Sequence, residues 1–340
     1  MISRSICTAA AALAGIAAGQ PAMAQSYPSQ NITLVIGFAT GGVVDVIARL
    51  LSQKVSEKSG KTLISENRGG AGGNLAAKSV VAAAPDGYTI LATATGLAIS
   101  ATAARNRGFA ISDLKPVAIV AATPDIVAVH PSNPAQTLAD YVASAKGKPT
   151  NYGSSGLGTP SHITTEYLLK IVAKLDVTHV TFTGGGPAVN AAVGNHIHLL
   201  AASLPTAIAQ IQGGQLRGLG IARATRHKAV PDLQTFAENG FAGIESSTWS
   251  GFFVPAKTPD AVVAWLNAEF NAALKQPDIQ AKLATLGFEP METTPASAAQ
   301  FFNREIESWA SRTTAIGHSR FVRRKGRGCR RRAKLPAWRI

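Results

Sequence analysis

Two glycine-rich stretches constrain this chain more than any other feature. Residues 33–42 read TLVIGFATGG, and residues 150–159 read TNYGSSGLGT. Each predicts a short strand that leads through a turn of small residues to the start of a helix. Such a turn leaves backbone N–H groups unpaired at the positive end of a helix dipole. Because the two stretches lie more than 100 residues apart, they predict a site for a small anion between two lobes.

The first 24 residues are expected to be a signal peptide. Arg4 supplies the positive charge, residues 6–18 form an apolar run, and Ala22-Met23-Ala24 offers a cleavage site of small residues. The run is shorter than the roughly 20 residues that a membrane span requires. No lipid-attachment motif precedes Cys7. We therefore expect export to the periplasm and cleavage after Ala24.

The formal net charge of +14 is concentrated at the C-terminus. Residues 316–340 contain ten basic residues and no acid, and setting these and Arg4 aside leaves 22 of the 33 basic residues against 19 acids. Such a tail can bind nucleic acid or an anionic membrane. Its composition changes abruptly after 315, so we expect a shifted reading frame or an altered terminus that is disordered. We expect no nucleic-acid binding by the nearly neutral folded body.

Alternating strand and helix patterns predict an α/β fold with mostly parallel sheets. Residues 88–92 are expected to be a strand and residues 161–175 a helix. Residues 116–122 and 126–129 are expected to be separate strands, with Thr123-Pro124-Asp125 between them. One late strand, 248–254, precedes three expected helices, 260–274, 277–286 and 296 to about 313. These helices are therefore assigned to the same lobe as the first third of the chain. Lobe 1 would comprise residues 25–124 and 246–315, and lobe 2 residues 125–245. Two chain crossings between the lobes would form a hinge.

The motifs of common enzymes are missing from the glycine-rich stretches. Residues 153–157 read GSSGL, which fails the G-x-S-x-G pattern of hydrolases. Residues 37–42 match neither the dinucleotide fingerprint nor a phosphate-binding loop with its lysine. His196 and His198 alternate on an expected strand and are interpreted as structural rather than metal-binding. We therefore expect no enzyme, no cofactor and no metal.

Several motifs, in this order and at consistent spacing, resemble the periplasmic Bug-type substrate-binding receptors of tripartite tricarboxylate transporters. The resemblance runs from Tyr27 to about Trp309. The motifs that carry it are Gly41-Gly42 with Asp45, residues 66–74 (ENRGGAGGN), 84–89 (APDGYT), 151–154 (NYGS) with Gly158-Thr159 and His162, 184–188 (GGGPA), Leu204-Pro205 and 213–217 (GGQLR).

The resemblance implies two α/β lobes of the periplasmic-binding-protein type (type II) that close on a ligand like a clamshell. Members hold a ligand carboxylate with two loops, one from each lobe, which here are residues 37–45 and 153–162. Residues 183–188 would border the pocket. The candidate ligand-binding residues are Phe38, Thr40, Gly41, Gly42, Asp45, Ser154, Ser155, Gly158, Thr159, His162, Gly185 and Ala188.

Each candidate also has a structural interpretation. Gly41 and Gly42 either allow close approach of a ligand or serve tight helix–strand packing. The hydroxyl groups of the two loops bind the anion or cap the helices that follow. Asp45 holds a bridging water or a ligand donor, or only favours its helix N-terminus. His162 is a site residue or a structural histidine at a helix start.

Departures from the family pattern bear on the ligand. Residues 200–203 read LAAS, where many relatives carry an acid before Leu-Pro, which removes a partner for a ligand ammonium group. We therefore expect a carboxylic acid without an amine. The protein is interpreted as a monomeric receptor that delivers this ligand to membrane transporter subunits. The alternative is a sensing receptor that passes its ligand-bound form to a signalling partner.

Overall fold

The computed structural model describes residues 27–103 and 107–315. Its first third contains β1 (Ile32–Ile36), α1 (Val43–Ser59), β2 (Leu63–Asn67), α2 (Asn74–Val81), β3 (Thr89–Ala94) and α3 (Gly96–Ala103). The middle contains β4 (Leu114–Val129), α4 (Leu138–Ala145), β5 (Thr150–Ser154), α5 (Pro160–Glu166), β6 (Val177–Thr181), α6 (Gly185–Val193), β7 (Leu199–Ser203), α7 (Leu204–Gln212) and β8 (Arg217–Ile221). The last part contains β9 (Ser247–Pro255), α8 (Asp260–Leu274), α9 (Pro277–Leu286), β10 (Glu289–Pro290) and α10 (Pro295–Ala315).

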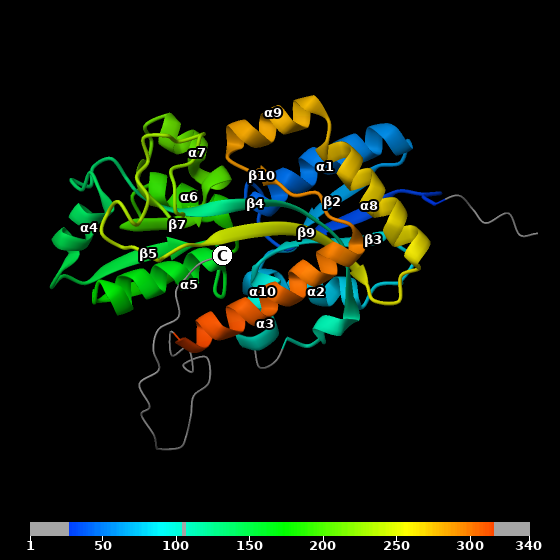
Figure 1. The fold of residues 1–340 in the computed structure, drawn as a ribbon, viewed down its shortest axis with the longest axis horizontal. Helices are drawn as coiled ribbons and strands as arrows, with labels where there is room; N and C mark the ends of the chain where they lie inside the picture. Colours follow the sequence, from blue (N-terminus) through cyan, green and yellow to red (C-terminus); the bar gives the residue numbers. More distant parts are fainter. Residues whose placement is uncertain (1–26, 104–106, 316–340) are drawn as a thin grey trace, which may run out of the picture.

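The strands form two lobes that share β4. The strand order is β2-β1-β3-β9-β4-β7-β5-β6, with β10 and β8 also paired to β4. β1 is parallel to β2 and β3, and β5 is parallel to β6 and β7. β4 and β9 run antiparallel to their neighbours and cross the middle of the molecule (Figure 1). The expected two-lobe α/β architecture is thus confirmed, with antiparallel strands joining the parallel ones.

The expected break at residues 123–125 is wrong, because β4 is one continuous strand. Its first part pairs with β9 as far as Pro124 opposite Ser247, and from Asp125 onward it pairs with β7 and β8. Pro124 lacks an N–H group and lies where the strand changes partners, a position at which proline interrupts little pairing. The turn-like sequence therefore marks the passage between lobes rather than a turn.

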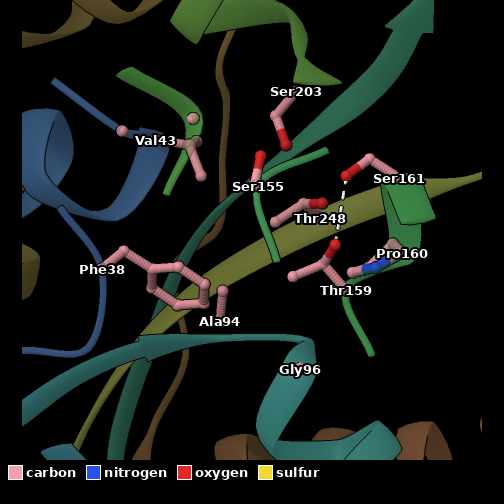
Figure 2. Close-up of a pocket in the computed structure, with 12 residues that line it drawn as sticks. Phe38, Val43, Ala94, Gly96, Ser155, Thr159, Pro160, Ser161, Ser203 and Thr248 are labelled. Carbon is pink, nitrogen blue, oxygen red and sulfur yellow. Dashed lines mark hydrogen bonds between the residues drawn. The ribbon is translucent and has the colours of Figure 1, made fainter. Parts of the chain in front are cut away.

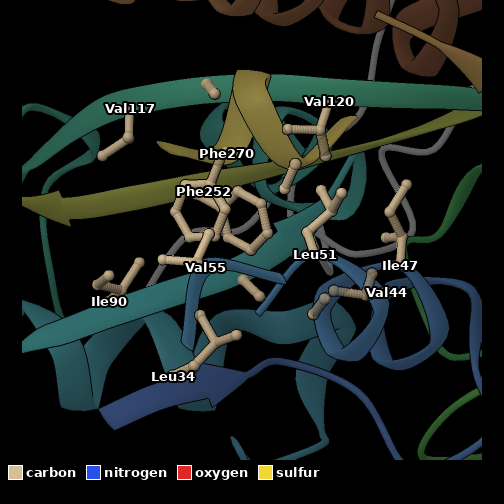
Figure 3. Close-up of a cluster of buried hydrophobic side chains, with 14 of the residues drawn as sticks. Leu34, Val44, Ile47, Leu51, Val55, Ile90, Val117, Val120, Phe252 and Phe270 are labelled. Carbon is tan, nitrogen blue, oxygen red and sulfur yellow. The ribbon is translucent and has the colours of Figure 1, made fainter. Parts of the chain in front are cut away.

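Helices cover both faces of the sheet in each lobe. In the first lobe, α1 and α8 pack on one face, where the rings of Phe252 and Phe270 stack 3.9 Å apart between their centroids (Figure 3). The opposite face is covered by α2, α3 and α10 around Trp249 and Phe253. Phe252 and Phe253 are neighbours on β9 and therefore point to opposite faces of the sheet, as the two-residue period of a strand requires. The site is thereby positioned by rigid, doubly covered sheets.

Local sequence sets the end of one helix and the winding of another. α1 ends at Ser59, and the next residue, Gly60, has a φ of 67° that suits glycine and donates its N–H to the carbonyl oxygen of Ser56. α5 continues as a π-helical turn over Tyr167–Val172, so the expected helix 161–175 is nearly continuous but changes its winding.

Among the described residues, no helix combines the length and apolar character that a membrane crossing demands.

Candidate functional site

A small pocket lies where loops of the two lobes meet (Figure 2). Phe38, Ala94 and Gly96 border it from the first lobe. Hydroxyl groups of Ser155, Ser161 and other residues point toward it on the opposite side. The full lining is Phe38, Gly42, Val43, Ala94, Gly96, Ser155, Thr159, Pro160, Ser161, Gly185, Ser203 and Thr248. No charged side chain is among these described lining residues.

Helix N-termini converge on this pocket. Within the described part of the chain, five helices have their N-cap or first residue in its lining: α1 at Gly42, α3 at Gly96, α5 at Thr159, α6 at Gly185 and α7 at Ser203. The first four N–H groups of a helix have no partner within that helix. Each N-terminus also carries a partial positive charge. The pocket is therefore suited to an anion that needs no positively charged side chain.

The two lobes touch directly on one flank of the pocket. The N–H of Ala39 donates to the carbonyl oxygen of Thr183 at 3.2 Å. A Cβ atom built on Gly186 would lie 2.4 Å from the carbonyl oxygen of Thr40. Glycine at position 186 therefore allows the backbones to come this close, and the structure has a closed arrangement of its lobes.

A second contact between lobes lies near residue 157. A Cβ atom built on Gly72 would lie 3.0 Å from the carbonyl oxygen of Leu157, and Gly72 has a φ of 64°. The same glycine packs under α3, because a Cβ atom on Gly96 would lie 2.6 Å from the carbonyl oxygen of Gly72. The glycine-rich stretch around residue 72 thus joins α3, which borders the pocket, to the second lobe.

Thr159 acts as a helix cap at the edge of the pocket. Its hydroxyl donates to the carbonyl oxygen of Gly156 at 2.8 Å and accepts from the N–H of His162 at 3.4 Å. Ser161 lies 3.2 Å away from the same hydroxyl oxygen. The hydrogen of Thr159 is thus already used within the protein. The capping interpretation holds for this residue, although it also lines the pocket.

A buried carboxylate lies behind the pocket, on β4. Asp125 is 3% exposed, and its Oδ1 accepts hydrogen bonds from the hydroxyls of Ser203 at 3.1 Å and Thr248 at 3.0 Å. Its Oδ2 accepts from the Ser246 hydroxyl at 2.5 Å. Burial raises the pKa of Asp125 to about 6, while the three hydroxyl donors oppose this shift. An acid therefore lies directly behind Ser203, although residues 200–203 lack the acid that many relatives carry there.

Five sequence candidates line the pocket: Phe38, Gly42, Ser155, Thr159 and Gly185. The seven others lie outside its lining. Asp45 is 3% exposed and accepts hydrogen bonds from the N–H of Gly41, from Arg49 and from Asn67. Thr40 donates to Asn67 at 3.3 Å. The structure therefore places Asp45, Gly41 and Thr40 in a network that supports the first loop.

The remaining candidates support the second loop or the core. The His162 ring stacks on His179 at 4.2 Å between centroids, and its Nδ1 accepts from the N–H of Gly158 at 3.2 Å. Ser154 lies 2.7 Å from Nε2 of His179, whose pKa is lowered to about 4 mainly by burial. Ala188 is fully buried in the core of the second lobe.

Several lining residues were missed in the sequence. Ala94 is the last residue of β3 and Gly96 the first residue of α3. The carboxyl ends of parallel strands commonly border ligand sites in α/β folds, so the strand expected at 88–92 could have indicated both. Thr248 lies on the crossing strand β9, where no sequence signal distinguishes it. Ser203 was considered only as a departure from the family pattern. Among the described residues, no group of three or more His, Cys, Asp or Glu side chains could hold a metal ion.

Comparisons with known proteins agree with this geometry. A relative from Pseudomonas sp. (strain P51), the UPF0065 protein in the tcbD-tcbE intergenic region, is 34% identical over 288 residues, which cover 84% of this chain and 85% of the relative. The solved structure of R. palustris Rpa4515 with adipate is 30% identical, with a TM-score of 0.82 over 86% of this chain and 98% of that chain. MatC from Rhodopseudomonas palustris, solved with bound malate, is also 30% identical, with a TM-score of 0.78 over 84% and 99%.

The family itself is also matched. The solved periplasmic binding protein BugD is 27% identical, with a TM-score of 0.81 over 86% of this chain and 99% of that chain. The model of the tripartite tricarboxylate transporter family receptors (TctC) matches residues 47–317. The resemblance to Bug-type receptors is thus confirmed. The chain belongs to the tripartite tricarboxylate transporter receptor family, whose members are periplasmic solute-binding proteins and not enzymes.

Proposed function

We propose that this protein captures a small carboxylate in the pocket between its lobes and delivers it to the membrane subunits of a tripartite tricarboxylate transporter. The observation that carries the proposal is the convergence of five helix N-termini on a pocket without charged lining residues. Unpaired N–H groups and helix dipoles favour an anion at such a place. The relatives solved with adipate and malate support a carboxylate, because both ligands are carboxylic acids.

The magnitudes are sufficient for a useful affinity. Enclosing a carboxylate removes much of its hydration, so its oxygens must be hydrogen-bonded. Each charge-assisted hydrogen bond contributes about 1.5–3 kcal/mol, and each helix terminus about 0.3–1 kcal/mol. Three or four such bonds with two dipoles contribute about 5–14 kcal/mol, a range that includes the roughly 8 kcal/mol of a micromolar affinity. First-turn N–H groups of α1 and α6 and the hydroxyl of Ser155 are the proposed donors.

The proposed ligand carries no ammonium group. An ammonium needs acceptors for three N–H bonds, whereas the helix N-termini at the pocket present donors and partial positive charge. Asp125 is separated from the pocket by the hydroxyls of Ser203 and Thr248, to which it is already bonded. A ligand cation would therefore lack direct contact with this acid.

We place the mature receptor in the periplasm as a monomer, after cleavage behind Ala24; residues 1–26 and 316–340 lie outside the described part of the chain. The proposed lobes are residues 25–124 with 246–315, and residues 125–245. Family membership favours transport over the alternative, a sensing receptor that passes its closed form to a signalling partner.

Isothermal titration calorimetry with mono-, di- and tricarboxylates tests the proposed ligand class. We expect at least one acid to bind at micromolar concentration, and its primary amide, which has a similar shape without the charge, to bind at least tenfold more weakly. Equal binding of acid and amide would contradict an anion site. Tighter binding of aspartate or glutamate than of every acid without an amine would contradict the proposed specificity.

A further inference from the structure

The two hydroxyl groups that connect Asp125 to the pocket have a fixed direction. Ser203 and Thr248 both line the pocket, and both donate to the same carboxylate oxygen, Oδ1 of Asp125. A hydroxyl has one hydrogen, and an ionised carboxylate only accepts. The hydrogens of both hydroxyls therefore point away from the pocket, and the oxygens offer it only lone pairs.

The helix that begins after Ser203 gives independent support for this direction. Ser203 is the N-cap residue of α7, a position at which serine normally accepts a hydrogen bond from the first turn of its helix. Its side chain makes no such capping bond. The Ser203 hydroxyl is oriented by Asp125 instead of by its own helix. Figure 2 shows this hydroxyl and that of Thr248 on the same side of the pocket.

The carboxylate itself is held firmly. The N–H of Asp125 donates to the carbonyl oxygen of Ser246 at 3.1 Å, and its carbonyl oxygen accepts from Ala222 at 2.8 Å. Ser246 also donates its hydroxyl to Oδ2, on the side away from the two pocket hydroxyls. Asp125 thus has a fixed backbone and three hydroxyl donors. It cannot rotate to release Ser203 or Thr248 without leaving buried oxygens unpaired.

We propose that Asp125 is a specificity-determining positioning residue, which turns Ser203 and Thr248 into acceptors so that the pocket selects a carboxylate bearing a hydroxyl group. The ligand carboxylate is held by the first-turn N–H groups of α1 and α6, and its hydroxyl donates to Ser203 or Thr248. A hydroxyl brings a single donor, which these oxygens satisfy. This inference rests on the proposed function, since it concerns the ligand of that pocket.

Matched pairs of acids test the proposal by calorimetry: lactate and propionate, malate and succinate, 2-hydroxyglutarate and glutarate, and 2-hydroxyadipate and adipate. In the pair that binds most tightly, we expect the hydroxylated acid to bind about two- to twelvefold tighter, the range for one neutral hydrogen bond. If no acid binds, the proposed function fails. If acids bind and the hydroxyl brings no gain, only the present inference fails.

Variants of the protein attribute the preference to Asp125. Asp125→Leu removes both acceptor oxygens and so frees the hydrogens of the Ser203 and Thr248 hydroxyls to turn toward the pocket, and the affinity ratio within the pair should fall to about one. Thr248→Val should lower the ratio while Asp125 stays in place, and it keeps the test decisive if Asp125→Leu does not fold. Thr178→Val is the matched control, because Thr178 is an exposed threonine on β6 outside the pocket lining, and this variant should preserve the ratio.

Two results would overturn the proposal. The first is an unchanged hydroxyl preference in both Asp125→Leu and Thr248→Val, with circular dichroism showing that the variants are folded. The second is tighter binding of the amino acid than of the hydroxy acid of the same length. That result would show that the ligand group donating to Ser203 or Thr248 is an ammonium rather than a hydroxyl.

Discussion

Adding one methyl group at Gly186 should hinder closure of the two lobes. Gly186 lies in the first turn of α6 in the second lobe, and its Cα faces the first loop of the other lobe. A Cβ atom there would lie 2.4 Å from the carbonyl oxygen of Thr40, well inside the distance that a real Cβ contact reaches. The contact atom is backbone, so no flexible side chain can move aside. In Gly186→Ala the lobes must therefore separate locally.

The size of the effect follows from the contacts that separation disturbs. Inserting a methyl group into a closely packed contact costs about 1–3 kcal/mol, and the bond from Ala39 to Thr183 at 3.2 Å is weakened at the same place. Affinity for the carboxylate should fall by about five- to 150-fold. Alanine favours a helix over glycine by up to about 1 kcal/mol. Without a ligand to hold them together, we expect the lobes to separate and relieve the strain, so the ligand-free protein should be as stable as the wild type or slightly more stable.

Calorimetry of the tightest-binding acid gives the affinity, and thermal unfolding without ligand gives the stability. Asn190→Ala is the matched control, because Asn190 lies on the same helix with its side chain exposed to solvent. We expect the control to bind like the wild type. Wild-type affinity in Gly186→Ala would refute the argument that ligand binding depends on this contact between lobes.

Three further predictions concern the site and the termini. Burial raises the pKa of Asp125 to about 6 from its ordinary 3.8. The folded state therefore holds the Asp125 proton more tightly than the unfolded state, and the free energy of unfolding should fall by roughly 3 kcal/mol as the pH rises from about 4 to 6. Urea unfolding across this range should show the fall in the wild type, and an equal fall in Asp125→Asn would contradict the assignment to Asp125. Gly42→Leu should abolish carboxylate binding and leave the circular dichroism spectrum unchanged, because Gly42 has an ordinary φ of −78° and the nearest atoms to its Cβ position are the carbonyl oxygen of Ala39 at 3.2 Å and the N atom of Gly185 at 3.5 Å, so a small shift of the loop admits the Cβ atom. Retained binding would mean that the first loop does not approach the ligand. Deletion of residues 316–340 should leave affinity within about twofold of the wild type, and a large loss measured by the same titration would assign the tail a part in binding.

The helices with clear amphipathic spacing or strong end signals could be predicted from the sequence. The expected helices 260–274 and 277–286 agree with α8 and α9 because proline opens each segment and glycine closes the second. α3 was missed, since its sequence GLAISATA is apolar or small throughout and has no polar face. Its N-terminus nevertheless borders the pocket. A helix buried between neighbours gives no periodic signal.

The candidate site was predicted where backbone conformation depends on local sequence. Gly42 and Gly185, which line the pocket, could be predicted because glycine-rich turns preceding helices have recognisable sequences. Asp125 and Thr248 could not be found in this way, because their roles arise when β4 and β9 come together across more than 100 residues. Asp45 and His162 were plausible candidates by type and position. The structure shows partners within the protein for both.

A crystal structure of the protein with its tightest-binding carboxylate would show whether both lobes hold the ligand anion. We expect the ligand carboxylate to accept hydrogen bonds from backbone N–H groups in the first turn of α1, within residues 43–45, and from Gly185 or Gly186 in α6. A carboxylate bound to one lobe alone, or in another cavity such as that lined by Arg223 and Glu245, would contradict it.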